Sequence, residues 1–170
     1  MPKGLEIEKK YLIAYPDEEL LVKKGAVVKE IEQTYLLSDV GSERVRASTA
    51  NGRTVYTHTQ KKKIKGIVRT EDEEVISEEE YRRLLMRADP ACVNIKKRRF
   101  VLKNGEFTYE IDLFPFWKDK AFLEIELERE DQTVDLPDFV TVLADVSEDK
   151  RYTNHALAKT LKGEKGDRPV

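Results

Sequence analysis

The sequence predicts a mainly β protein of the α+β class: a closed eight-stranded antiparallel β-barrel with a few helices packed outside it. Three observations support this fold. Eight segments alternate polar and apolar residues with the period of two that is typical of β-strands. Short connections join many of them, which favours antiparallel neighbours. The polar positions of a segment mostly carry charges of one sign, whereas a sheet face in contact with water usually mixes them.

The predicted strands begin near the N-terminus and follow one another with few interruptions. Turn residues at Gly41-Ser42, Asn51-Gly52 and Asn104-Gly105 are typical of hairpins, and Gly66 marks another break. The strands cover residues 5–12, 31–37, 43–49, 54–61, 67–75, 94–102, 106–113 and 121–128.

Four shorter segments are predicted to be helical: residues 17–24, 77–87, 137–145 and 154–161. The segment 77–87 has the clearest start, because Ser77 is a good N-cap and Glu80 follows three residues later, as in a capping box. We expect a single domain over residues 1–162 and a disordered tail over residues 163–170.

The charge balance limits the partners of the chain. Of its 170 residues 38% are charged, against about 25% in an average globular protein, yet the formal net charge is only −2. A nucleic-acid-binding surface is usually far more basic. The N-terminus lacks the apolar core of a signal peptide, and no stretch approaches the ~20 apolar residues of a membrane span. We expect a cytoplasmic monomer or homodimer with no nucleic-acid or membrane partner.

The chain contains a single cysteine, Cys92, and two histidines, His58 and His155. No intrachain disulfide is possible, and so few soft ligands argue against a Cys/His zinc site. We expect Cys92 to be inert. A metal would then be held by carboxylates, which prefer hard cations such as Mg²⁺ or Mn²⁺.

Charged residues gather on one face of each predicted strand, because side chains at positions i and i+2 share a face. A sheet with a wet outer face would explain any one strand. Repeated like charges repel, however, unless something of opposite charge lies between them. If these faces point inward, the barrel encloses a charged tunnel suited to a polyanion that carries a divalent cation. The main faces are Glu6/Glu8/Lys10, Arg44/Arg46, Thr57/Thr59/Lys61, Arg69/Glu71/Glu73, Lys97/Arg99, Glu110/Asp112 and Glu124/Glu126.

The E-x-E-x-K pattern at residues 6–10 resembles the signature of the CYTH domain, the fold of the triphosphate tunnel metalloenzymes. Further matches occur in the order of that family and together cover about residues 5–155. They are QTYL (33–36), RVR (44–46), TQK (59–61), RTEDE (69–73), KRR (97–99), YEIDLF (109–114), EIELE (124–128) and DKRYTN (149–154).

This resemblance implies roles for particular residues. Glu6, Glu8 and Glu126 would bind the catalytic metal, Mg²⁺ or Mn²⁺, with Glu124 nearby. Lys10 and Tyr35 resemble a pair that helps to activate water. The segment 61–65 is more basic than a usual connector, and alternation favours Lys61 and Lys63 as the inward residues. Phosphate contacts are implied for Lys10, Arg44, Arg46, Lys61, Lys97, Arg99 and Arg151, and the similar acidic tunnel residues are Glu71, Glu73, Glu110 and Asp112.

The implied activity is that of a metal-dependent triphosphatase, a phosphoanhydride hydrolase that removes the terminal phosphate of a triphosphate. Inorganic tripolyphosphate is the favoured substrate, which would make the chain a tripolyphosphatase. Thiamine triphosphate and nucleoside triphosphates are alternatives. Two other functions stay open: a class IV-type adenylate cyclase, which forms cyclic AMP and pyrophosphate from ATP, and a non-catalytic polyphosphate binder.

Overall fold

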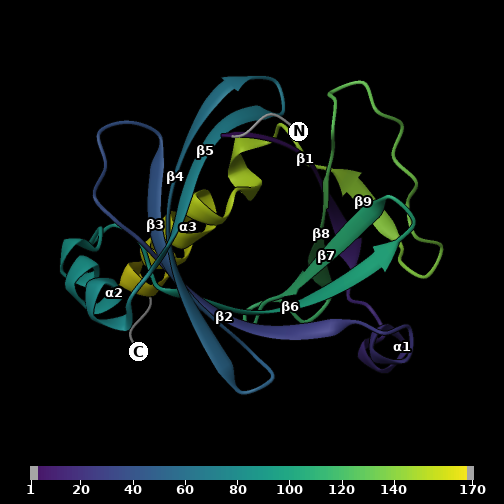
Figure 1. Cartoon of the computed structure of the whole chain (residues 1–170), viewed down its shortest axis with the longest axis horizontal. Helices are drawn as coiled ribbons and strands as arrows, with labels where there is room; N and C mark the ends of the chain where they lie inside the picture. The colour runs from purple at the N-terminus through teal and green to yellow at the C-terminus, as the bar shows by residue number, and fades with distance from the viewer. Residues whose placement is uncertain (1–3, 168–170) are drawn as a thin grey trace.

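The computed structural model describes residues 4–167 and confirms a closed antiparallel barrel (Figure 1). The described strands form one sheet in the order β5-β4-β3-β2-β6-β7-β8-β1-β9. An additional pairing of β1 with β5 closes eight of them into the barrel, and β9 adds a ninth strand beside β1. All of these pairings are antiparallel.

The strands of the first half of the barrel, β1 to β4, are longer than the sequence predicts, and the helices are short except for the last. The strands are β1 Leu5–Ala14, β2 Val27–Tyr35, β3 Ser42–Ala50, β4 Arg53–Lys65, β5 Val68–Ile76, β6 Ile95–Asn104, β7 Phe107–Leu113, β8 Lys120–Glu126 and β9 Val142–Asp145. The helices are α1 Glu18–Lys23, α2 Glu78–Leu84 and α3 Asn154–Asp167, with short 3₁₀ helices η1 Leu85–Arg87 and η2 Lys150–Tyr152.

The structure differs from the predicted elements at two places. The predicted helix over residues 137–145 is wrong, because residues 142–145 form β9, with Leu12 opposite Ala144. Three consecutive β-branched residues, Val140 to Val142, favour an extended chain there. Helix α3 extends past the predicted 154–161 to Asp167, and residues 168–170 of the expected tail lie outside the described residues.

Local sequence explains several element boundaries. Asn51 and Gly52 both have positive φ, 53° and 75°, as the type I′ hairpin between β3 and β4 requires. The Ser77 hydroxyl accepts a hydrogen bond from the Glu80 N–H and caps α2. At Gly41, directly before β3, a Cβ atom would clash with the carbonyl oxygen of Lys61 on β4, so only glycine fits there.

The apolar faces of the strands point out of the barrel and are covered from several sides. Leu123 and Ile125 of β8 belong to a buried cluster against which Phe139 and Val140, from the segment before β9, pack. Helix α2 covers another side, where Tyr81 and Leu84 meet Val45. None of the helices in the described part of the chain is long and apolar enough to cross a membrane.

Helix α3 lies within the outline of the barrel in Figure 1. Its residues Leu157 and Ala158 join a buried cluster with Tyr35, Ile95 and Phe122 from the strands. The helix thus fills one end of the barrel interior and leaves the remaining interior space to charged side chains.

Candidate active site

A cavity of about 350 Å³ occupies the barrel interior. Charged side chains dominate its wall, and the segment from Val146 to His155 forms one end of it. Its carboxylates are Glu6, Glu8, Glu71, Glu73, Glu110, Glu124, Glu126 and Asp149, and its cationic groups are Lys10, Arg44, Arg46, Lys61, Arg69 and Arg99.

Glu8 and Glu126 form the centre of an acidic half of the cavity. They lie directly opposite each other on the paired strands β1 and β8. Burial raises the pKa of Glu8 to about 8, and the nearby Glu124 and Glu6 add to the rise. Burial also raises the pKa of Glu126, with a further contribution from Glu6. Both carboxyl groups therefore lack sufficient positive charge around them.

Glu6 has a cationic partner, in contrast to Glu8. The Lys61 ammonium lies 3.0 Å from the Glu6 carboxylate. Burial works to raise the pKa of Glu6, but Lys61 and a hydrogen bond with Glu71 hold it below its ordinary value. Burial and the bond to Glu6 raise the pKa of Glu71 to about 7. The protonated Glu71 carboxyl group thus donates a hydrogen bond to the Glu6 carboxylate.

A hard divalent cation fits this acidic half. Glu8 and Glu126 are opposed carboxylates with too little compensating charge, and Glu6 lies on the same strand face as Glu8. In residues 4–167 one group of three potential ligand atoms lies mutually within 4.8 Å, and it is not among these carboxylates. The arrangement instead matches the way Mg²⁺ is usually bound, by one or two carboxylates together with substrate phosphate oxygens.

Arg44 and Arg46 of β3 form the centre of a basic half. The Arg46 guanidinium donates hydrogen bonds of 3.1 and 2.8 Å to the Gln33 side-chain oxygen. The Arg44 Nε atom is buried and has no hydrogen-bond partner among the described residues. Burial lowers the pKa of Arg46 to about 9, and Arg44 and Arg99 lower it further. An anion between these groups would accept a hydrogen bond from Arg44 Nε and reduce the repulsion between the guanidinium groups.

A buried ionic network supports the wall where the two halves meet. Asp112 accepts from Arg99 Nε at 2.7 Å and lies 2.8 Å from Lys97 Nζ. Although Asp112 is buried, these two cations hold its pKa well below the ordinary value. Glu124 lies between Lys10, at 3.4 Å, and Arg99, at 3.6 Å. Most of the charge of Glu124 is therefore matched by protein cations.

Most residues implied by the resemblance lie on the cavity wall, and three do not. Lys97 and Asp112 are 0% exposed and lie behind the wall. Arg151 is 81% exposed and pairs with Asp149 at 2.7 Å, outside the cavity. In the basic segment 61–65, Lys61 reaches the cavity, whereas Lys63 is exposed to solvent.

Tyr35 lies at the end of the cavity that α3 closes. Its hydroxyl accepts a hydrogen bond of 3.2 Å from the Gln33 amide, and its ring stacks on that of His155 with centroids 4.7 Å apart. Lys10 lies further along the wall, with its ammonium 4.0 Å from the Phe122 ring centroid. The two residues implied to activate water thus lie on the same cavity wall.

Several lining residues carry no assigned role in the sequence analysis. Arg69 could have been found, because it shares a strand face with Glu71 and Glu73. The remainder come from the start of β3, from the turn between β4 and β5, and from the segment that runs from the end of β9 into the first turn of α3, where strand alternation gives no signal. They are Ser42, Ile67, Val146, Ser147, Asp149, Tyr152, Thr153, Asn154 and His155.

Solved structures resemble this chain, although no protein-family model and no curated protein matches it. Two structures of the protein NE1496, described once as a hypothetical protein and once as an inorganic triphosphatase, are 28% and 26% identical to it. Each match covers 91% of this chain, with 97% and 94% of NE1496 covered and TM-scores of 0.54 and 0.53. The PH1012 protein from Pyrococcus horikoshii OT3 is 26% identical over 74% of this chain and 80% of its own, with a TM-score of 0.53.

These likenesses extend over most of the chain and agree with the barrel fold. The structural neighbours of this chain are CYTH-type proteins, which confirms the resemblance seen in its sequence.

Proposed function

We propose that this chain is a metal-dependent triphosphatase that hydrolyses the terminal phosphoanhydride bond of inorganic tripolyphosphate. The observation that carries the proposal is the division of one cavity into two oppositely charged halves. Glu8 and Glu126 lack positive partners, and Arg44 and Arg46 lack negative ones, within the described structure. A triphosphate with a bound divalent cation supplies both missing charges at once.

The composition of the wall favours an inorganic triphosphate over a nucleotide. Ligand sites for organic molecules are lined mainly by apolar and aromatic side chains. The aliphatic lining residues of this cavity are Ile67 and Val146. Of its two tyrosines, Tyr35 is already stacked on His155 and Tyr152 packs edge-on against Phe122. The described lining thus offers little apolar surface for a purine or a thiazolium ring. The 26% identical NE1496, described as an inorganic triphosphatase, gives the same preference.

The geometry suggests a separate role for each group of lining residues. Arg44 and Arg46 would bind and orient the phosphate chain, and Lys10 and Lys61 would add positive charge along it. Glu6, Glu8 and Glu126 would hold the divalent cation, which when bound neutralises charge on the terminal phosphoryl group. Tyr35 accepts from Gln33, so its own hydroxyl proton remains available for a water molecule or a phosphate oxygen.

A substrate panel tests this proposal. Purified protein is incubated with tripolyphosphate, thiamine triphosphate or ATP, each with Mg²⁺, with Mn²⁺ or with excess EDTA. We expect equal amounts of orthophosphate and pyrophosphate from tripolyphosphate, in the metal-containing samples alone. Glu8→Gln should abolish this release, whereas Glu79→Gln, on the exposed face of α2, should leave it unchanged.

Two results would contradict the proposal. Formation of cyclic AMP and pyrophosphate from ATP without orthophosphate release would identify a cyclase. Binding of tripolyphosphate with no turnover under any metal condition would identify a binding protein.

A further inference from the structure

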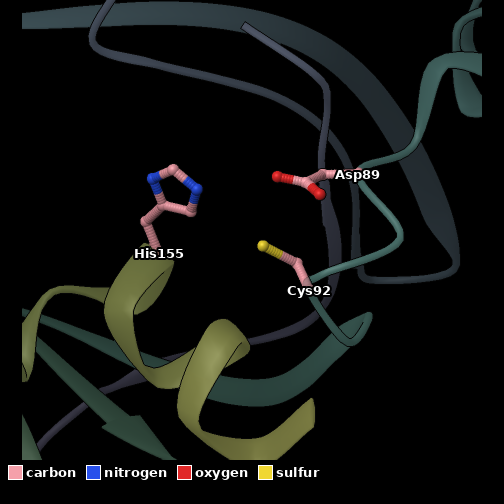
Figure 2. A group of neighbouring side chains, drawn as sticks. All are labelled: Asp89, Cys92 and His155. Atoms are coloured by element: carbon pink, nitrogen blue, oxygen red, sulfur yellow. The ribbon is translucent and has the colours of Figure 1, made fainter. Parts of the chain in front are cut away.

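A second group of ligand-type side chains lies beside the closed end of the barrel (Figure 2). Asp89 and Cys92 belong to the loop between η1 and β6, and His155 belongs to the first turn of α3. One ligand atom from each residue, a carboxylate oxygen, a sulfur and an imidazole nitrogen, lies within 4.8 Å of the other two. Figure 2 shows the three side chains pointing toward a shared space, with a ring nitrogen of His155 facing the other two.

His155 supplies an independent reason to look for a ligand there. Its Nε2 atom is buried and has no hydrogen-bond partner within residues 4–167. Buried polar atoms are nearly always hydrogen-bonded, and an exception usually marks a water molecule or an ion. The stack on Tyr35 fixes the plane of the imidazole ring but leaves this nitrogen unsatisfied.

Backbone hydrogen bonds hold the loop and the helix that carry the three side chains. The Asp89 N–H donates to the Tyr35 carbonyl at 2.9 Å, and the Cys92 N–H donates to the Asp89 carbonyl at 3.1 Å. The Val93 N–H donates to the Ala158 carbonyl at 3.0 Å, which ties the loop directly to α3. One Asp89 carboxylate oxygen accepts from the Ala91 N–H at 2.9 Å. The Cys92 thiol also donates a hydrogen bond to the Asp89 carboxylate, and a bound metal ion would take the place of that proton.

We propose that Asp89, Cys92 and His155 bind a zinc ion, with water as the fourth ligand. Thiolate, imidazole and carboxylate are the three ligand types of protein zinc sites, and three protein ligands plus water is an established set. Thiolate and imidazole together disfavour Mg²⁺, so this site differs in kind from the carboxylates of the tunnel. Ligand atoms around a tetrahedral zinc ion lie roughly 3.5 Å apart. The three ligand atoms here lie within 4.8 Å of one another, so a modest rotation of the side chains would bring them to that spacing.

This proposal departs from the expectation that so few cysteines and histidines argue against a zinc site. The fold brings Cys92 and His155 together from distant parts of the sequence. A bound ion would fasten α3 to the loop after η1 and fix His155 against Tyr35, a residue of the tunnel wall. The site would thereby stabilise the closed end of the tunnel, whatever substrate the tunnel accepts.

Cobalt titration of the full chain, without any triphosphate, tests the site. Co²⁺ replaces Zn²⁺ in such sites and gives a thiolate-to-cobalt charge-transfer band. Cys92 is the single cysteine of the chain, so this band reports on this site alone. We expect the band to saturate at one Co²⁺ per chain, to persist in excess Mg²⁺ and to disappear when Zn²⁺ is added.

Matched variants assign the ligands. His155→Phe keeps an aromatic ring against Tyr35 but removes the nitrogen, and should weaken Co²⁺ binding by more than about tenfold. Cys92→Ser should abolish the band and the rise in melting temperature that Zn²⁺ gives the parent protein. His58→Gln, which changes the other histidine, should retain the band at the parent affinity.

The proposal fails if the folded parent protein gives no charge-transfer band. It also fails if His155→Phe binds Co²⁺ as tightly as the parent, or if saturation requires two chains per ion. None of these readouts depends on triphosphatase activity, so they separate this proposal from the proposed function.

Discussion

Lys10 stands where the acidic and the basic halves of the cavity meet. It shares a strand face with Glu8, and its ammonium lies 3.4 Å from Glu124 and 4.0 Å from the centroid of the Phe122 ring. The E-x-E-x-K pattern thus places two carboxylates of the acidic half beside one ammonium on the cavity wall. In the proposed function these three charges would act on different parts of one ligand.

Glu8 gives the sharpest prediction at the residue scale. Glu8→Gln removes one of two opposed carboxyl groups, so we expect loss of metal-dependent phosphate release together with a gain in stability without metal. The gain should be about 1 kcal/mol or more, because a carboxyl group whose pKa rises to about 8 on folding must take up a proton at neutral pH, and glutamine avoids this cost. Urea unfolding in EDTA at neutral pH measures the second effect. A variant that is both active and less stable than the parent would refute this account of Glu8.

Arg46 gives a prediction about substrate binding. Two of its guanidinium nitrogens are held by Gln33, which fixes the orientation of the planar group. Lysine keeps the positive charge but lacks the planar group with several N–H donors. We expect Arg46→Lys to raise the KM for tripolyphosphate by about tenfold or more, with a circular dichroism spectrum like that of the parent. An unchanged KM would show that Arg46 supports the wall without contacting substrate.

At the scale of elements, Glu43 connects β3, β4 and η1 on the outer side of the barrel. Its carboxylate lies 2.6 Å from His58 Nε2 on β4 and 2.8 Å from Arg87 in η1. His58 thus points away from the cavity, as its place in the strand alternation predicts. The interaction holds β3 in position while its alternate residues, Arg44 and Arg46, face the tunnel.

The Glu43 interaction should make stability depend on pH. Burial works to raise the pKa of Glu43, but the hydrogen bonds with His58 and Arg87 hold it below its ordinary value of 4.5. A lowered carboxyl pKa contributes stability above pH 4.5, which is lost as the pH falls through the pKa of the folded state. We expect Glu43→Gln to cost about 1–2 kcal/mol at pH 7.

Urea unfolding of the parent and of Glu43→Gln from pH 7 to pH 3 measures this contribution. The difference between the two proteins should shrink toward the acidic end of the series. A constant difference would mean that packing, and not the charge of Glu43, sets the cost.

At the scale of the whole molecule, the alternation of side chains along strands explains how much of the site could be predicted. Every charged residue assigned to the wall by a strand position reaches the cavity, except Lys97 and Asp112, which pair behind it, and Lys63, which is exposed to solvent. Alternation gives the face of a strand but not the depth at which a pair is buried. The alternation rule does not apply to the segment between β9 and α3 or to the first turn of α3. The place of His155 on the wall and its approach to Cys92 therefore could not be predicted.

The two halves of the cavity should bind their ligands cooperatively. Each half contains like charges that the other does not neutralise, so a cation or an anion alone removes half of the repulsion. We expect Mg²⁺ and tripolyphosphate together to raise the melting temperature by more than the sum of their separate effects, with a coupling of about 1–3 kcal/mol. A non-hydrolysable tripolyphosphate analogue in place of the substrate removes turnover from the comparison. Additive shifts in the parent protein would argue against a shared site.

The most direct test of the central claim is anomalous diffraction from crystals soaked with Mn²⁺ and a non-hydrolysable tripolyphosphate analogue. We predict a manganese peak at Glu8 and Glu126 and phosphate density against Arg44 and Arg46, inside the barrel. Manganese bound away from these carboxylates, or analogue density outside the cavity, would contradict the assignment of the tunnel as the triphosphate site.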